Sequence, residues 1–261
     1  HKMSFNSQRI RRMRRLARDT QVRELERLFV VEGPRLVEEA IKANLKIDEV
    51  ILPEDEVDHD LVTVLSQEKI QFHLVARKIF DGLTTLRNPQ AAIASVHQHG
   101  LELGDLVQKK GLLLVLSGVS DPGNCGNLIR TAEAFGASGI LFHGGVDPYN
   151  PKVVRSSAGS FFRMRFAALK EELSHKKLFE ELKKSDYRSV ATAPSGGIAP
   201  EDVAGDSPIA VILGNEPRGL PKEIEALCDD IVTVPIEDTV ESLNVATAGA
   251  VILYGIKRSL I

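Results

Sequence analysis

The feature that most constrains the fold of this chain is a regular alternation of hydrophobic runs and helical stretches that starts at residue 111. The runs expected to form strands are residues 112–117, 139–143, 188–193, 209–214 and 231–235. The helices expected between and after them are residues 124–136, 151–158, 174–185, 220–227 and 242–259. Strands that alternate with helices favour a mostly parallel sheet covered on both faces. The sequence therefore predicts an α/β fold for this part of the chain.

A smaller α/β unit is expected before it. Apolar residues recur at helical intervals over residues 9–28, and a second helix is expected from Pro34 to about residue 43. The strands expected here are residues 29–31, 50–52, 72–75 and 91–96. The polar stretch that follows indicates a join, so the expected domains are residues 1–97 and 111–261, with a linker at 98–110. His97 and His99 are expected to be exposed linker residues, because no third metal ligand follows at a suitable spacing.

Composition narrows the functional classes. Hydrophobic residues make up 43% of the 261 residues and charged residues 26%, which is typical of a soluble globular protein. No apolar run approaches the roughly 18 residues that a bilayer span needs, so no membrane partner is expected. Cys125 and Cys228 form neither a disulfide framework nor a metal site, which favours a reducing cytoplasm and no bound metal. Cys125 is a candidate nucleophile or a small buried residue, and the absence of a nearby His favours the second.

The charge is unevenly distributed along the chain. The formal net charge is −3, but residues 2–30 hold nine Lys and Arg against three Asp and Glu, a local balance of +6. A basic segment on a nearly neutral protein points to a polyanion, and adjacent like charges are costly without an anion nearby. The alternative is a solvated helix face. The arginines of this segment that are expected to bind RNA are Arg9, Arg11, Arg12, Arg14 and Arg15.

Three turns rich in Gly, Pro and Asn follow predicted strands of the larger domain. Because the carboxyl ends of parallel strands share one edge of a sheet, we expect the three turns to form one site. The first, DPGNCGN at residues 121–127, precedes a helix that carries Asn127 and Arg130 on one face. Arg130 there is either a ligand for a phosphate or carboxylate, or a surface residue paired with Glu133. The turn lacks the dinucleotide and P-loop fingerprints.

The second and third turns have different characters. GNEPRGLP at residues 214–221 needs a tightly shaped backbone, and Glu216 in it either accepts a ligand hydrogen bond or supports the next helix. The third, SLN at residues 242–244, begins a helix rich in small residues. Gly249 within that helix costs roughly 1 kcal/mol against Ala, which suggests that another group approaches the helix closely there.

Together the three stretches resemble a known family. DPGNCGNLIRTAEAFG, ILGNEPRGLP and VPIEDTVESLNVATAGAVILY, with GGVDPYNPKVVRSSAGSFFR between the first two, are similar to the motifs of SpoU/TrmH-type RNA ribose 2′-O-methyltransferases in the SPOUT superfamily. The resemblance covers nearly all of residues 112–258, and the first 96 residues are more weakly similar to a ribosomal-protein-like RNA-binding domain. It implies a trefoil-knotted methyltransferase domain, a rare exception to unknotted topology, and a homodimer.

The resemblance also implies a reaction and its residues. S-adenosylmethionine would donate a methyl group to a ribose 2′-hydroxyl of RNA. The residues implied for the cofactor are Leu213, Gly214, Val234, Ile236 and Leu243. Those implied for catalysis are Arg130, Asn124, Glu216, Ser242 and Asn244. We interpret Arg130 as the ligand of a neighbouring RNA phosphate, because a guanidinium is a poor base.

The RNA itself is expected to be ribosomal, since the accessory domain resembles those of ribosomal RNA enzymes. Arg155 is a second candidate for RNA contact, or a dimer or surface residue. The alternatives are a transfer RNA methyltransferase and a non-catalytic RNA-binding protein on the same fold. A nucleotide-dependent oxidoreductase is disfavoured by the missing fingerprint.

Overall fold

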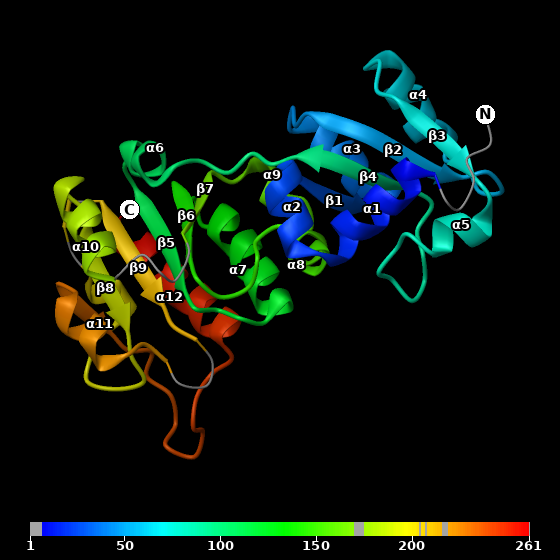
Figure 1. Ribbon diagram of the computed structural model, residues 1–261. Helices are drawn as coiled ribbons and strands as arrows, with labels where there is room; N and C mark the ends of the chain where they lie inside the picture. The colour runs from blue at the N-terminus through cyan, green and yellow to red at the C-terminus, as the bar shows by residue number, and fades with distance from the viewer. Residues whose placement is uncertain (1–6, 170–174, 204, 207, 216–218, 261) are drawn as a thin grey trace. The chain divides into compact units, whose positions relative to one another are not determined.

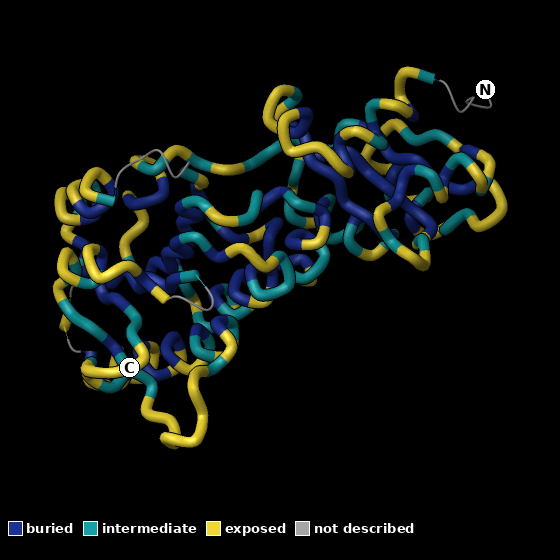
Figure 2. Tube along the Cα trace, turned by 60° about the horizontal axis from the view of Figure 1, so that its bottom comes forward, coloured by how far each residue is buried: buried dark blue, intermediate teal, exposed yellow. Residues whose placement is uncertain are grey.

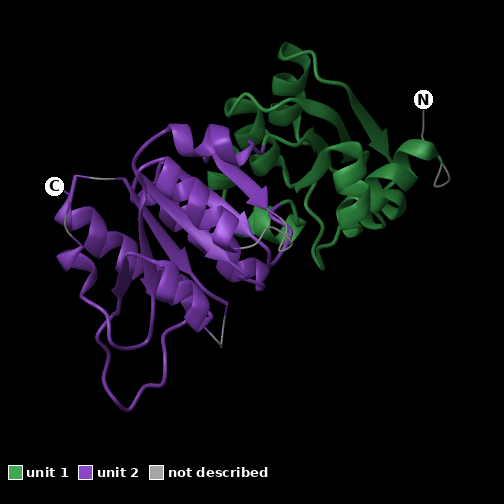
Figure 3. Cartoon of the chain, turned by 60° about the vertical axis from the view of Figure 1, so that its left-hand side comes forward, with its two compact units in different colours: residues 1–99, 149–163 green, residues 100–148, 164–261 purple. Residues whose placement is uncertain are grey.

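The computed structural model describes residues 7–169, 175–203, 205–206, 208–215 and 219–260 (Figure 1). These residues form two compact units, and each unit has its own sheet and its own helices (Figure 3). The first comprises residues 1–99 and 149–163, and the second comprises residues 100–148 and 164–261. No helix among the described residues is long and apolar enough to cross a bilayer.

The first unit is built on a four-stranded sheet in the order β1-β4-β2-β3. Only β2 and β3 run parallel; β4 is antiparallel to both β1 and β2. The elements are α1 (Gln8–Arg18), α2 (Thr20–Glu26), β1 (Leu28–Glu32), α3 (Pro34–Lys42), β2 (Ile47–Pro53), α4 (His59–Gln67), β3 (Phe72–Val75), α5 (Arg77–Asp81), β4 (Ile93–His97), α8 (Pro151–Ser156) and α9 (Ser160–Arg163).

One helix was expected over residues 9–28, and that expectation is wrong. Two helices form, because Asp19 adopts an extended backbone and caps the second one through the amides of Gln21 and Val22. The apolar spacing identified the correct face, since Ile10 and Met13 of α1 are buried against β1. An acidic cap inside a continuous apolar pattern is thus what divides the segment.

The expected linker at 98–110 is also different in the structure. Residues 103–108 form α6 (Leu103–Gln108), whose Leu106 and Val107 are buried in the core of the second unit. His97 ends β4, and His99 packs among the rings of Phe29, Tyr149 and Phe161 rather than lying exposed. Burial lowers the pKa of His99, although its hydrogen bond to the Phe161 carbonyl works in the opposite direction.

The second unit holds a fully parallel six-stranded sheet in the order β10-β8-β9-β5-β6-β7. Strands β5, β6 and β9 are buried along their whole length, which explains their unbroken hydrophobic sequences. The elements after α6 are β5 (Leu112–Ser117), α7 (Pro122–Ala134), β6 (Gly139–His143), β7 (Phe166–Leu169), α10 (His175–Lys184), β8 (Arg188–Thr192), a 3-10 turn η1 (Pro200–Asp202), β9 (Ile209–Leu213), α11 (Lys222–Leu227), β10 (Asp230–Val232) and α12 (Val245–Ser259).

Helices cover the two faces of this sheet separately. Alternate residues of β5 and β9, such as Val115 and Ile212, share one cluster with α6, α10 and α11. On the opposite face α12 packs on α7, and a Cβ at Gly249 would lie 2.4 Å from Leu128 Cδ2 and 3.0 Å from Leu213 Cδ1. The close approach expected at Gly249 is therefore confirmed. Figure 2 shows the strands of this sheet buried in the interior of the second unit, whereas residues 235–242 form an exposed loop.

Candidate functional site

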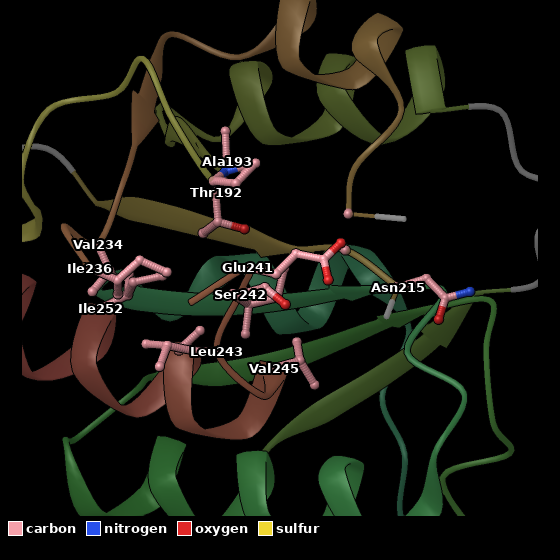
Figure 4. A pocket seen from close by; sticks show the side chains of 15 residues that line it. Thr192, Ala193, Asn215, Val234, Ile236, Glu241, Ser242, Leu243, Val245 and Ile252 are labelled. Carbon is pink, nitrogen blue, oxygen red and sulfur yellow. The ribbon is translucent and has the colours of Figure 1, made fainter. Parts of the chain in front are cut away.

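A pocket opens at the carboxyl edge of the parallel sheet, and residues of the second and third turns line it, whereas none of residues 121–127 does. It lies where β8 and β9 end, where the chain leaves β10 and where α12 begins (Figure 4). The described residues that line it are Thr192, Ala193, Pro194, Leu213, Gly214, Asn215, Gly219, Val234, Ile236, Glu241, Ser242, Leu243, Val245, Ala248 and Ile252. All five residues expected to hold the cofactor are in this set.

The wall at the end of β9 is formed by Gly214, Asn215 and Gly219, which lie close together. The amide of Gly219 donates to the Asn215 carbonyl at 2.7 Å, and a Cβ at Gly214 would lie 2.5 Å from the Gly219 carbonyl carbon. Gly214 is therefore required by the close return of the backbone. Ser120 of the first turn donates to Asn215 Oδ1 at 3.4 Å, which links the first two turns. Glu216, the residue after Asn215 in the sequence, lies outside the described residues.

The third stretch enters the pocket as an extended chain. The expectation that helix α12 starts at residue 242 is wrong, because it begins at Val245 with Asn244 as its cap. Asn244 Oδ1 accepts from the amides of Ala246 at 2.9 Å and Thr247 at 3.3 Å. Ser242 and Leu243 consequently precede the helix and face the pocket.

A side-chain hydrogen bond joins the first turn to the third. Asn244 Nδ2 donates to Asn124 Oδ1 at 3.0 Å, across 120 residues of sequence. Each asparagine is also fixed by its own helix end, since the Asn124 amide donates to the capping carboxylate of Asp121 at 2.8 Å. Two of the predicted catalytic residues therefore meet at the starts of α7 and α12.

Arg130 stands apart from this contact. It lies on α7 six residues after Asn124, which corresponds to about 9 Å along the helix axis, and its side chain is exposed. It does not line the pocket, and with the described residues it makes no hydrogen bond or ion pair. The alternative that Arg130 pairs with Glu133 is thus absent from the structure. A guanidinium left available beside the pocket helices suits an external anion.

Cys125, next to Asn124, is a packing residue. It is 1% exposed, and burial, with the nearby charges of Asp121 and Asp147, raises the pKa of its thiol to about 12. A thiol in this state is not a nucleophile at neutral pH. The buried alternative for Cys125 is confirmed. The described residues contain no group of three His, Cys, Asp or Glu side chains that could hold a metal ion.

The arginines of the first unit divide into two groups. Arg9 donates to Glu49 at 3.0 Å, Arg12 pairs with Glu26 and Asp48, and Arg14 donates to the Gly82 carbonyl at 3.1 Å. Arg11 and Arg15 are exposed, and no described residue pairs with them. Three of the five arginines that the sequence assigned to RNA binding therefore have partners within the protein.

Arg155 lies in the first unit as well. Its Nη1 is 3.8 Å from Oε2 of Glu32, a buried carboxylate that also accepts from the Thr85 amide and hydroxyl. This ion pair ties α8 to β1, whose residues are far apart in the sequence. Contact of Arg155 with RNA stays a prediction.

Several pocket residues were missed in the sequence. Thr192 ends β8, and Ala193 and Pro194 follow it at the same sheet edge. The sequence PSGG at residues 194–197, a turn after a predicted strand, could have indicated them. Glu241 was missed because it adjoins a motif residue without standing out by spacing. Ala248 and Ile252 lie on the first turns of α12, where their periodicity suggested only helix packing.

Comparisons with known proteins agree with this geometry. The model of the SpoU rRNA Methylase family matches residues 111–254, and the model of the MRM3-like substrate binding domain matches residues 7–94. The 23S rRNA (guanosine(2553)-2′-O)-methyltransferase RlmP of Bacillus subtilis is 30% identical over 231 residues, which are 88% of each chain. The 23S rRNA (guanosine-2′-O-)-methyltransferase RlmB of Bordetella pertussis is 29% identical over 80% of this chain and 87% of its own.

Solved structures share this fold. The AdoMet-bound rRNA methyltransferase of Sinorhizobium meliloti superposes with a TM-score of 0.87 at 27% identity, over 100% of this chain and 98% of that one. The SpoU methyltransferase AviRb of Streptomyces viridochromogenes, in complex with AdoMet, has a TM-score of 0.89 at 24% identity, over 98% of both chains, which supports the fold.

Proposed function

The chain belongs to the SpoU rRNA methylase family, and from this membership and its pocket we propose that it transfers a methyl group from S-adenosylmethionine to a ribose 2′-hydroxyl of ribosomal RNA. The observation that carries the proposal is the Asn124–Asn244 hydrogen bond, which joins two of the family's motifs beside an apolar pocket. Because Asn244 also caps α12, its contact with Asn124 is the part of this arrangement that the helix cap alone does not require.

The pocket residues fit S-adenosylmethionine. Leu213, Val234, Ile236, Leu243 and Ile252 supply apolar walls that suit an adenine ring, and the backbone of the lining residues that follow β9 and β10 is proposed to hydrogen-bond its edge. No acidic ribose clamp is needed in such a site, which is compatible with the missing dinucleotide fingerprint. The cofactor supplies an electrophilic methyl group bonded to a sulfonium.

The chain's own residues position the acceptor and its proton. Transfer yields a 2′-O-methyl ether, a thioether and one proton, so the hydroxyl proton has to leave. We assign Ser242 and Asn244 to placing the hydroxyl, and Arg130 to holding the adjacent phosphate, so that the phosphate or a water takes the proton. Glu216 is proposed to hold the second turn. Alignment of the two reacting groups supplies much of the rate.

Ribosomal RNA is the favoured substrate because the relatives RlmP and RlmB are named as 23S rRNA 2′-O-methyltransferases. Both relatives align with most of this chain, including part of each unit. The match of residues 7–94 to a substrate binding domain supports RNA contact by the first unit, where Arg11 and Arg15 remain available. A ribosomal substrate implies work in the cytoplasm. Transfer RNA remains the second candidate, on family grounds alone.

The finer architecture is proposed on the same basis. A trefoil knot within residues 111–261 is supported by β9 returning between β5 and β8, and by Gly197, where a Cβ would lie 2.6 Å from the Ile231 carbonyl oxygen.

A homodimer through α12 is supported by Val251 and Tyr254, which are 41% and 51% exposed on this apolar helix. The first unit, residues 1–99 and 149–163, is the proposed RNA-binding part, and the second unit, residues 100–148 and 164–261, is the proposed catalytic part.

Methylation mapping tests the function. Ribosomal and transfer RNA lacking the modification would be incubated with the full chain and labelled S-adenosylmethionine, and the nucleosides analysed by mass spectrometry. We expect one 2′-O-methylated nucleotide in 23S ribosomal RNA. Label on a base, or label only in transfer RNA, would contradict the proposal as stated, and cofactor binding without any transfer would favour the non-catalytic alternative.

A further inference from the structure

The described residues that line the pocket are neutral with one exception. Among the described lining residues, Glu241 is the one that carries a charge. It belongs to the loop between β10 and α12, immediately before Ser242. The family motifs did not single it out, and the roles assigned above do not use it.

The position of this carboxylate is central. Figure 4 shows Glu241 and Ser242 side by side, between the apolar group of Val234, Ile236 and Ile252 and the side of the pocket where Asn215 lies. Glu241 makes no hydrogen bond or ion pair with a described residue, in contrast to Thr192, whose hydroxyl donates to the Ile212 carbonyl at 2.9 Å. The carboxylate is thus available to a ligand in the pocket.

The two small-molecule ligands of the reaction differ in charge at one atom. The donor has a positively charged sulfonium, whereas the product S-adenosylhomocysteine has a neutral thioether; their ammonium, carboxylate and adenosine groups are the same. A carboxylate near the sulfur therefore stabilises the bound donor and leaves the product unaffected. Glu241 itself is exposed, so this attraction is that of a charge pair in contact with water rather than of a buried pair.

We propose that Glu241 is the counter-charge for the sulfonium, and that it makes the pocket prefer the methyl donor over the spent product. This inference rests on the proposed function. The interaction is non-covalent: the charge on sulfur disappears when the methyl group leaves, and the attraction to Glu241 disappears with it. Glu241 thereby favours exchange of product for fresh donor after each turnover.

Neighbouring acidic residues provide a matched control. Glu237 and Asp238 lie on the same exposed loop but do not line the pocket. Their charges act on the donor only through solvent, where salt screens them within about 10 Å. Glu237→Gln removes the same charge as Glu241→Gln from the same loop, so the comparison isolates the position of the carboxylate.

Calorimetric titration of the full chain with each ligand separately tests the proposal, using wild type, Glu241→Gln and Glu237→Gln. We expect Glu241→Gln to weaken S-adenosylmethionine binding by about three- to tenfold and S-adenosylhomocysteine binding by less than about twofold, which is the scale of a partly exposed charge pair. Glu237→Gln should leave both affinities within about twofold. Product binding also serves as the folding control for each variant.

Two outcomes would overturn the inference. Equal weakening of both ligands by Glu241→Gln would mean that the carboxylate holds a group the two share, such as the ammonium. Unchanged affinity for both would mean that it holds nothing. Failure of the proposed function looks different, since the wild-type chain would then bind neither ligand, or would bind the donor without transferring a methyl group to ribosomal RNA.

Discussion

At the scale of single residues, the site depends on which polar groups have partners inside the protein. Asn124 and Asn244 bond to each other, whereas Arg130 makes no bond with a described residue. The two asparagines therefore fix each other within the protein, whereas Arg130 is available to an external group. Under the proposed function, Asn124 and Asn244 shape the site and Arg130 holds the substrate phosphate.

Replacing Arg130 tests the capture role. We expect Arg130→Ala to lower the rate of methyl transfer by about 100-fold or more, because a positioned charge at the reacting group is lost. Cofactor affinity should stay within about twofold, since Arg130 does not line the pocket. Arg130→Lys, which keeps the charge without the planar fork, should recover only part of the rate. Turnover near the wild-type rate in Arg130→Ala would remove this residue from the mechanism.

Cys125 offers a chemical test of the packing around α7. Burial and two nearby carboxylates raise the pKa of its thiol to about 12, so the reactive thiolate is scarce at neutral pH. We expect the native chain to resist alkylation of Cys125 by iodoacetamide at pH 8 and to be labelled quickly in denaturant, as peptide mass spectrometry would report. Rapid labelling of the folded chain would show that this residue is reachable and ionised.

At the scale of elements, helix ends position the site. Asp121 caps α7 and Asn244 caps α12, so the start of α12 beside the pocket and the start of α7, which the Asn124–Asn244 bond joins to it, are both fixed by short polar side chains. The sequence predicted both helices but placed the start of α12 three residues early, because an apolar pattern does not show which polar residue turns inward to cap. That shift matters, since it leaves Ser242 and Leu243 in the pocket rather than in the helix.

The two functions of Asn244 can be separated by substitution. Asn244→Asp keeps an oxygen that caps α12 but loses the amide donor to Asn124, so we expect stability within about 0.5 kcal/mol of wild type and methyl transfer reduced by about tenfold. Asn244→Ala loses both and should also unfold about 1 kcal/mol more easily. Thermal unfolding and turnover would be measured on the same samples. Full activity in Asn244→Asp would refute a functional hydrogen bond.

At the scale of the whole molecule, the sequence predicted far more of the second unit than of the first. Long buried parallel strands such as β5 and β6 have unmistakable apolar runs, and the turns after them fall on one edge by topology. The features that the sequence did not predict depend on contacts between residues far apart in the chain. Helix α6 forms within a polar stretch that was expected to be a linker. Helices α8 and α9 belong to the first unit although they lie within the sequence of the second. The sequence likewise did not predict that Arg12 forms ion pairs with Glu26 and Asp48.

RNA binding tests the role of the first unit. We expect Arg11→Ala with Arg15→Ala to weaken RNA binding and to reduce the slope of log affinity against log salt by about 1 to 2, since each arginine that contacts a phosphate releases about one counterion. Arg12→Ala is the control: its internal ion pairs should make it cost stability, by about 1 kcal/mol, more than RNA affinity. Filter binding over a salt series measures this. An unchanged slope in the double variant would place the RNA elsewhere.

We propose that the ends of β8, β9 and β10 and the start of α12 form the methyl-donor site. A crystal structure of the chain soaked with S-adenosylmethionine is the decisive test. We expect density for the donor between Leu213, Val234, Ile236 and Leu243, with its sulfur beside Glu241 and Ser242. A donor bound at any other place on the chain would contradict it.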